Sequence, residues 1–356
     1  MNKAYCSKKY CYYCNVIRRK YQAKKHLKKK DKKKFSKNSF CKKIKPFEYP
    51  SLELNKKDIN KIIDDTIKLS ENPESFAISF RKLVKFDLGL CLIFTSLLEH
   101  FSEAKNVRFA FKKHLMPKDK NIRNMFIQTG IFGILCNKPI QIQEGKMCIL
   151  KASISNAEEL KQVLLKISKE IVKFSLEKIN IADNSNARKH LNKIFDELLL
   201  NVKSHAYTDK IVYLAGEVQQ DVIKFAILDK GIGFAGSIQK RSDFMDNFFD
   251  KLNPNNGNYV KVIFESNMKR HRNYSGENIS RGNGTKRLEE NIRKCKGAKM
   301  QIISKQDFYE LYCDDKNTTK YSSNSNKVKD HEAIGTLISF ELPIREFLTG
   351  VQDGNI

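Results

Sequence analysis

Residues 211–233 read IVYLAGEVQQDVIKFAILDKGIG, and this stretch decides the fold of the C-terminal half of the chain. Two runs of mainly apolar residues, separated by the polar Gln219-Gln220-Asp221, predict two consecutive strands joined by a tight turn. The second run ends at Asp229, which Gly231 and Gly233 follow. A carboxylate at a strand end, beside glycines that allow close approach to the backbone, suits recognition of an amino group on a planar ring.

The helix predicted before these strands, over residues 186–205, carries a polar stripe. Glu197, Asn201 and His205 are spaced at i, i+4 and i+8, so their side chains project from one face. A carboxylate, an amide and an imidazole on one face can hold a hydrated cation and activate a water. The same spacing also describes an ordinary solvated helix face, and the spacing alone favours that interpretation.

Two further glycine clusters follow the strands. Residues 280–292 form a loop with Gly282 and Gly284 that runs into a predicted helix, whose free N–H groups and dipole would bind phosphate. Gly335 and Thr336 lie in the last predicted strand. Any one such cluster is more often a plain turn, so the order of the motifs carries the information.

In this order, the four motifs resemble those of the GHKL (Bergerat-fold) ATPases, a group that includes gyrase, heat-shock chaperone ATPases, sensor kinases and anti-sigma kinases. The resemblance implies that Glu197 polarises the attacking water or hydroxyl, that Asn201 binds Mg²⁺ and that His205 lies near the phosphates. It also implies an acid and glycines around the adenine and two lid glycines at the phosphates. These residues are Asp229, Gly231, Gly233, Gly335 and Thr336 for the adenine, and Gly282 and Gly284 for the phosphates.

The lid departs from the family pattern. Where the family usually reads Gly-x-Gly-Leu-Gly, this chain has Gly284-Thr285-Lys286 and lacks the last glycine. Lys286 and Arg287 can compensate as cations in contact with the phosphates, which makes both of them candidate catalytic groups. This pattern favours nucleotide binding over rapid turnover.

The middle of the chain, residues 47–150, alternates strand-like and helix-like patterns and predicts a small α/β domain. It resembles a STAS domain, the fold of anti-anti-sigma factors, because Asp87-Leu88-Gly89 stands where that family has Asp-Ser-Ser-Gly and Thr129-Gly-Ile-Phe132 resembles a later turn. Leu88 replaces the phosphorylatable serine. The resemblance therefore implies a protein-interaction module that is not a phospho-switch, and a generic α/β domain is the alternative.

The first 46 residues hold 18 Lys and Arg but a single acid, Asp31, so this arm carries most of the net charge of +27. Like charges repel and supply no core, which predicts a flexible or marginally helical arm. Such an arm binds polyanions such as nucleic acid through counterion release. The alternative is a solvated tail without a defined partner.

Four cysteines of the arm form a candidate zinc site. Cys11 and Cys14 have the CxxC spacing of half a tetrahedral site, Cys6 precedes them, and either Cys41 or His26 would supply the fourth ligand. A metal would order this segment, which has no core of its own. Incidental reduced cysteines are the alternative, because no second CxxC follows.

The length and composition of the chain indicate the number of its domains and its compartment. With 356 residues and 40% apolar residues, the chain is long enough for about two domains besides the arm. No apolar signal segment follows the start, and the longest apolar run, Leu88–Leu98, is too short to span a bilayer. We therefore expect a cytoplasmic protein without a membrane partner.

The sequence thus predicts an α/β protein with three parts: an arm over 1–46, a STAS-like domain over 47–150 and a GHKL-type domain over 151–356. The second domain would have a mixed sheet with helices on one face. The expected function is Mg²⁺-dependent ATP binding, with ATP hydrolysis driving a regulatory switch in signalling or stress response, and with a protein partner at the STAS-like domain or a homodimer. Alternatives are an anti-sigma-type serine kinase and a nucleic-acid-binding protein with a degenerate ATP site.

Overall fold

In the computed structural model the fold described here belongs to the unit formed by residues 45–356. The structure describes residues 47–49, 51–71, 78–105, 113–131, 148–153, 185–205, 211–219, 221–239, 289–290, 292–314, 319–322 and 328–352, together with isolated positions between 162 and 177 and Val260. The predicted arm and its cysteines lie outside these ranges.

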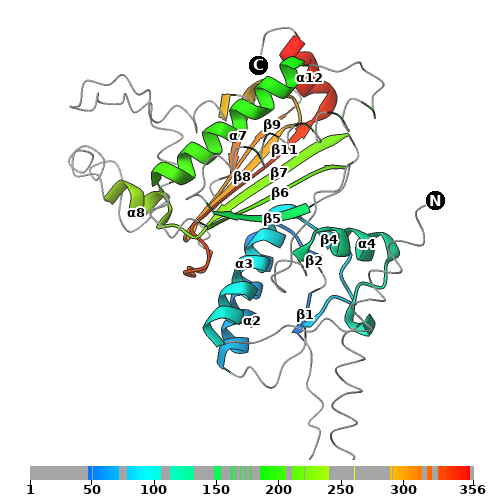
Figure 1. The fold of residues 1–356 in the computed structure, drawn as a ribbon, viewed down its shortest axis with the longest axis vertical. Helices are drawn as coiled ribbons and strands as arrows, with labels where there is room; N and C mark the ends of the chain where they lie inside the picture. The colour runs from blue at the N-terminus through cyan, green and yellow to red at the C-terminus, as the bar shows by residue number, and fades with distance from the viewer. Residues whose placement is uncertain are drawn as a thin grey trace, which may run out of the picture. The chain divides into compact units, whose positions relative to one another are not determined.

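A seven-stranded sheet, with the order β10-β9-β8-β11-β7-β6-β5, organises this unit (Figure 1). Its strands are β5 (Cys148–Ser153), β6 (Ile211–Gln219), β7 (Val222–Asp229), β8 (Lys299–Ser304), β9 (Asp307–Cys313), β10 (Thr319–Ser322) and β11 (Thr336–Pro343). The hairpin predicted from residues 211–228 is confirmed as β6 and β7, which pair antiparallel from Val212–Asp229 to Gln219–Val222.

Every described pairing in this sheet is antiparallel, whereas the family resemblance implies a mixed sheet. The short connections explain this arrangement, because a tight turn joins β6 to β7 and another joins β8 to β9, and such turns link only antiparallel neighbours. At the edge, β10 occupies part of the polar stretch 316–330 and pairs with β9. Backbone hydrogen bonds to β9 form there whatever the polarity of the side chains.

Helices cover both faces of the sheet, in contrast to the one-sided cover that the sequence predicted. Helices α7 (Ser185–His205) and α12 (Ile344–Gln352) lie over one face, where Leu214 and Phe225 belong to a first hydrophobic core. Helices α3 (Leu88–Lys105) and α2 (Lys56–Glu71) contribute to a second core that contains Tyr213 and Leu228 of the opposite face. Because both faces of β6 and β7 are apolar, each face needs a covering layer.

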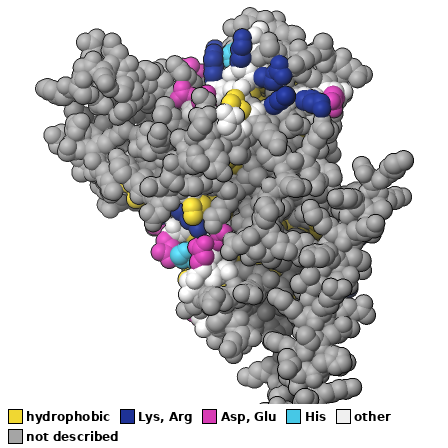
Figure 2. Space-filling view, in the orientation of Figure 1, with side chains coloured by type: hydrophobic (Ala, Val, Ile, Leu, Met, Phe, Trp, Pro, Cys, Tyr) yellow, Lys and Arg dark blue, Asp and Glu magenta, His cyan; other side chains and the backbone are white. Residues whose placement is uncertain are grey.

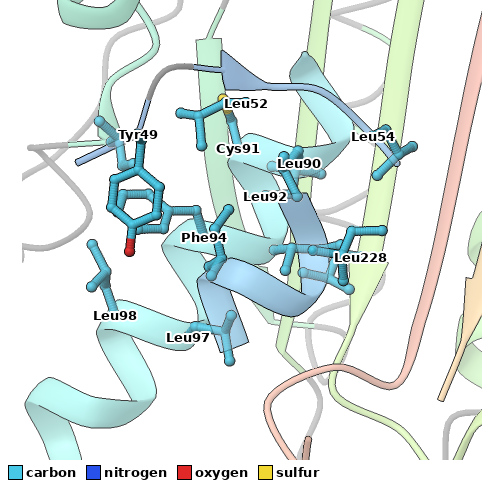
Figure 3. Close-up of a cluster of buried hydrophobic side chains, with 14 of the residues drawn as sticks. Tyr49, Leu52, Leu54, Leu90, Cys91, Leu92, Phe94, Leu97, Leu98 and Leu228 are labelled. Carbon is cyan, nitrogen blue, oxygen red and sulfur yellow. The ribbon is translucent and has the colours of Figure 1, made fainter. Parts of the chain in front are cut away.

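Helix α3 is the link between the middle segment and the sheet. It contacts β6, β7 and β11, and its residues from Leu88 to Glu99 are almost all buried (Figure 3). Asp87 caps its first turn by accepting a hydrogen bond from the Leu90 N–H at 3.1 Å. A Cβ on Gly89 would lie 3.2 Å from both Leu337 Cδ2 and Ser339 Cβ of β11, so the glycine lets the helix approach the sheet closely.

The rest of the middle segment consists of short elements. Two parallel strand pairs and two helical pieces lie beside α2 and α3: β1 (Phe47–Glu48) with β3 (Ile78–Ser79), β2 (Ser51–Leu52) with β4 (Lys85–Phe86), a 3₁₀ helix at Lys113–Leu115, and α4 (Lys120–Gln128). The alternation of strand-like and helix-like patterns predicted for the middle segment is confirmed by these elements. Residues 107–111 and most of 156–179 lie outside the described residues.

The expected boundary between residues 150 and 151 falls inside β5, which pairs with β6 as part of the large sheet. Within the described ranges, no helix has the length and apolarity that crossing a membrane requires. Figure 2 shows Lys and Arg side chains gathered over the part of the surface formed by α7 and α12.

Candidate functional site

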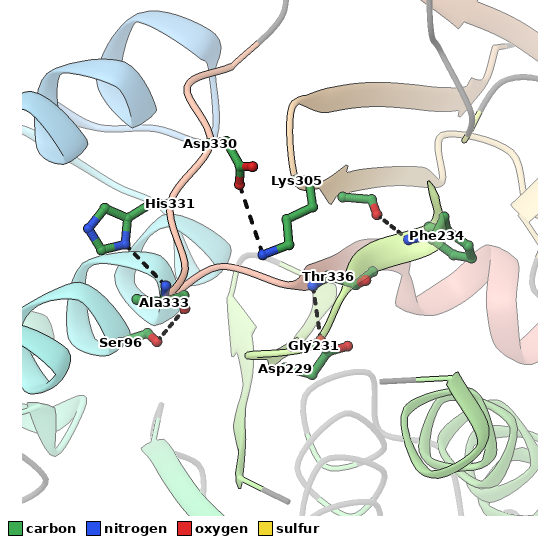
Figure 4. A network of polar contacts seen from close by, with 10 residues as sticks. Ser96, Asp229, Gly231, Phe234, Lys305, Asp330, His331, Ala333 and Thr336 are labelled. Atoms are coloured by element: carbon green, nitrogen blue, oxygen red, sulfur yellow. Dashed lines mark hydrogen bonds and ion pairs between the residues drawn. The ribbon is translucent and has the colours of Figure 1, made fainter. Parts of the chain in front are cut away.

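Asp229 ends the central strand β7, is only 4% exposed, and forms the centre of the candidate site (Figure 4). Its Oδ1 accepts hydrogen bonds from the N–H groups of Gly231 at 2.6 Å and Thr336 at 3.1 Å. The Gly335 N–H donates to the Asp229 carbonyl oxygen at 2.9 Å. The structure therefore brings together four of the residues that the sequence assigned to one site.

Glycine is required at position 335 for a steric reason. A Cβ on Gly335 would lie 2.1 Å from the Gly231 nitrogen and 2.3 Å from Asp229 Oδ1, distances that no side chain can occupy. The two glycine-containing segments thus touch through their backbones directly over the carboxylate. This close contact is possible only because neither Gly231 nor Gly335 carries a side chain.

Gly233 is required for a conformational reason. Its φ is +72°, a region that L side chains rarely adopt, and it begins helix α8 (Gly233–Gln239). The next residue, Phe234, donates its N–H to Ser304 Oγ at 2.7 Å. The chain can therefore turn away from the end of β7 within a few residues and begin α8.

The sequence did not single out Ser304 and Lys305, which support the site from the hairpin between β8 and β9. Lys305 donates its N–H to the Gly335 carbonyl oxygen at 3.0 Å and has a φ of 55°. Its ammonium lies 3.9 Å from Asp330 Oδ1. The polar Lys305-Gln306 pair between two alternating strands indicates a turn, but no local signal indicates that this turn lies beside Gly335.

Burial raises the pKa of Asp229 to about 6, while the hydrogen bonds from Gly231 and Thr336 and the charge of Lys305 act to lower it. The carboxylate is therefore mainly ionised at neutral pH. Its Oδ1 already has two donors, whereas Oδ2 makes no hydrogen bond with any residue in the part of the chain that the structure describes. A carboxylate oxygen without a donor is a strong acceptor for a donor group of a ligand.

The polar stripe on α7 is described at one of its three positions. Glu197 is half-buried, while its neighbours Phe195 and Leu198 are buried in the core between α7 and the sheet. Asn201 and His205 belong to α7, and their side chains lie outside what the structure describes. Helix α7 also contacts α8, which begins at Gly233, so the stripe belongs to a helix that adjoins the segment following Asp229.

The remaining predicted site residues fall outside the described ranges. They are Gly282, Gly284, Lys286 and Arg287 of the predicted lid, and Cys6, Cys11, Cys14 and Cys41 of the candidate zinc site. In the described part of the chain, no group of three or more His, Cys, Asp or Glu side chains is placed to hold a metal ion. The Mg²⁺ role of Asn201 and the zinc site stay predictions.

A groove of about 770 Å³ lies elsewhere on the α3 side of the sheet and includes none of the predicted site residues. Charged side chains of neighbouring strands line it and pair with one another: Lys224 with Glu341 at 3.4 Å and Lys299 with Glu310 at 3.0 Å. Because these charges neutralise one another across the strands, the groove offers no convergent set of groups for a ligand.

Comparison of the chain with models of protein families, with curated proteins and with solved structures gives no match. The function of the site is therefore inferred from its residues and their contacts.

Proposed function

We propose that this protein binds ATP with Mg²⁺ at the site around Asp229 and hydrolyses it as the step that drives a conformational switch. The observation that carries the proposal is the state of the Asp229 carboxylate. The N–H groups of Gly231 and Thr336 donate to Oδ1 and hold the carboxylate in place, while Oδ2 has no hydrogen-bond donor among the residues that the structure describes.

An adenine ring fits this arrangement chemically. Its exocyclic amino group is a donor for Oδ2, and its flat face can approach the backbone at Gly231, which carries no side chain. The guanine edge presents a carbonyl oxygen where adenine has the amino group, so a carboxylate there favours ATP over GTP. The proposal therefore includes a preference for adenine nucleotides.

The catalytic groups of the proposal come from the sequence motifs. Asn201 would hold Mg²⁺ across the phosphates, and Glu197 would orient a water for in-line attack. Lys286 or Arg287 would stabilise the negative charge that develops on the transferred phosphate. Glu197 is half-buried on α7, where a carboxylate keeps contact with water.

Calorimetric titration of the full chain with ATP and with GTP, each with and without Mg²⁺, tests the proposal. We expect saturable ATP binding at least tenfold tighter than GTP binding, and phosphate release only in the presence of Mg²⁺. Asp229→Asn is the matched loss-of-binding variant, because it keeps the shape of the side chain and removes the negative charge of the carboxylate. Equal binding of ATP by the wild type and by Asp229→Asn would show that the site is elsewhere.

A further inference from the structure

Helix α3 carries three polar residues, Ser96 and, about one helical turn later, the adjacent pair Glu99 and His100. All three contact segments that adjoin Asp229 or Gly335, although α3 belongs to the middle segment of the chain. No motif in the sequence assigns α3 a role at this site.

Ser96 and His100 hold the segment that leads into Gly335. Ser96 is fully buried, and its Oγ donates to the Ala333 carbonyl oxygen at 2.7 Å (Figure 4). His100 Nε2 lies 2.8 Å from Glu332 Oε1. Ala333 precedes Gly335 by two residues, so these contacts fix the path along which Gly335 reaches Asp229.

Glu99 holds the other side of the site. Its carboxylate is 4% exposed, accepts a hydrogen bond from the Tyr213 hydroxyl, and lies 3.8 Å from the ammonium of Lys230. Lys230 lies between Asp229 and Gly231 in the chain. Its side chain points to the α3 face of the sheet, whereas the candidate site is formed by the Asp229 carboxylate and the Gly231 N–H group. Losing one member of a largely buried ion pair of this kind is destabilising, because the desolvation of the remaining charge is no longer compensated by the opposite charge.

These contacts bear directly on the Asp229 carboxylate. Its Oδ1 needs the N–H groups of Gly231 and Thr336 at the same time, and α3 holds both segments, one through Lys230 and the other through Ala333. A shift of α3 would therefore act on the segments that carry both donors. The nucleotide affinity of the site then depends on where α3 lies.

We propose that Ser96 and Glu99 are positioning residues of the Asp229 site, through which the middle segment sets nucleotide affinity; the affinity part of this inference rests on the function proposed above. A partner or ligand that moves α3 would thereby change nucleotide binding without touching the nucleotide. The middle segment thus regulates the site through α3, which packs on the face of the sheet opposite α7.

The test uses the full chain with Glu99→Gln, Ser96→Ala and the control Glu53→Gln. Glutamine at position 99 still accepts from Tyr213 but loses the charge that pairs with Lys230. Glu53 is a carboxylate of the same middle segment whose ion pair, with Lys85 at 3.1 Å, lies away from Asp229. Two readouts are measured: ATP affinity by calorimetry, and amide hydrogen exchange of residues 231–236 and 333–336.

We expect Glu99→Gln and Ser96→Ala each to weaken ATP binding about tenfold, with faster exchange in those two segments and unchanged exchange in β8 and β9. A double-mutant cycle of Glu99→Gln with Lys230→Met should show that the two effects are not additive. Wild-type affinity and exchange in both variants would overturn the inference. Faster exchange throughout the sheet, or an equal loss of affinity in Glu53→Gln, would also overturn it by showing a merely structural role.

The exchange readout separates this inference from the proposed function. If the wild-type chain does not bind ATP, the proposed function fails, and the exchange of residues 231–236 and 333–336 still decides whether Ser96 and Glu99 position them. Unchanged exchange in that case overturns the positioning role as well.

Discussion

The Asp229 carboxylate accepts a hydrogen bond from the backbone N–H of Thr336, 107 residues further along the chain, at 3.1 Å. The contact joins two central strands of the sheet, β7 and β11, which pair along their length from Leu228–Leu337 to Val222–Pro343. This hydrogen bond lies one residue beyond the last paired residues of the two strands, and it holds the Asp229 carboxylate in place as an acceptor.

Gly335→Ala should disrupt this anchor more than any other single methyl addition near it. The new Cβ would lie 2.1 Å from the Gly231 nitrogen, so the two segments must separate. We expect loss of about 2–3 kcal/mol in the free energy of unfolding and loss of ATP binding. Urea denaturation and calorimetry measure both. Ser339→Ala, on the same strand away from Asp229, is the control and should leave ATP affinity unchanged.

Asp229→Asn should separate stability from binding. The folded pKa of Asp229 is about 6 against an ordinary value of 3.8, so between these values the folded state holds the proton more tightly. Stability linked to this group is present below about pH 4 and is lost as the pH rises through 6, by about 3 kcal/mol. At pH 8 we expect Asp229→Asn to unfold at a higher temperature than the wild type but to bind no ATP. A variant that is less stable at pH 8 would contradict the burial argument.

A second acid, Glu217, should make the free energy of unfolding fall as the pH rises from about 4.5 to 7. It is 8% exposed, and burial raises its pKa to about 7, with Lys224 acting to lower it and Asp87 and Glu341 acting to raise it. The folded state therefore binds the proton more tightly between pH 4.5 and 7, and about 3 kcal/mol of stability is lost across that range. Glu217→Gln should flatten the dependence of the unfolding temperature on pH between 5 and 8. A profile identical to that of the wild type would refute the shift.

Glu197→Ala should abolish hydrolysis and leave binding intact. The side chain is half-buried on α7, so its removal costs less than about 1 kcal/mol of stability, while the loss of an oriented water lowers turnover by about 100-fold or more. Phosphate release and calorimetric titration measure the two properties on the same sample. Asp196→Ala, the exposed neighbouring acid on the same helix, should retain full turnover. Normal turnover in Glu197→Ala would remove this residue from the mechanism.

The arm can be tested independently of the ATP site. Residues 1–46 hold 18 Lys and Arg and one acid, so their removal should weaken binding to nucleic acid and reduce the slope of log affinity against log salt. Fluorescence anisotropy with a labelled oligonucleotide across a salt series measures both quantities. ATP affinity serves as the internal control and should not change. Unaltered oligonucleotide affinity would exclude a nucleic-acid role for the arm.

Several elements could be predicted from the sequence because their signals are local. The alternating runs around Gln219-Gln220-Asp221 specify a hairpin, and the positive φ of Asp221 at 62° matches a residue type that tolerates a tight turn. The apolar composition of 88–101 specifies a buried helix. The layer that covers this helix could not be predicted, because an apolar stretch indicates that it is buried but not which distant apolar surface it packs against.

Local patterns in the sequence specify which residue types stand at the candidate site: an acid that ends a strand, and glycines where the backbone must come close. The packing of distant segments places Gly335 against Gly231 over Asp229, brings Ser304 and Lys305 beside them, and places Glu99 of α3 next to Lys230. The reason is physical. Turn and strand preferences act over a few neighbouring residues, whereas these contacts depend on the register of antiparallel strands and on the helix that covers each face.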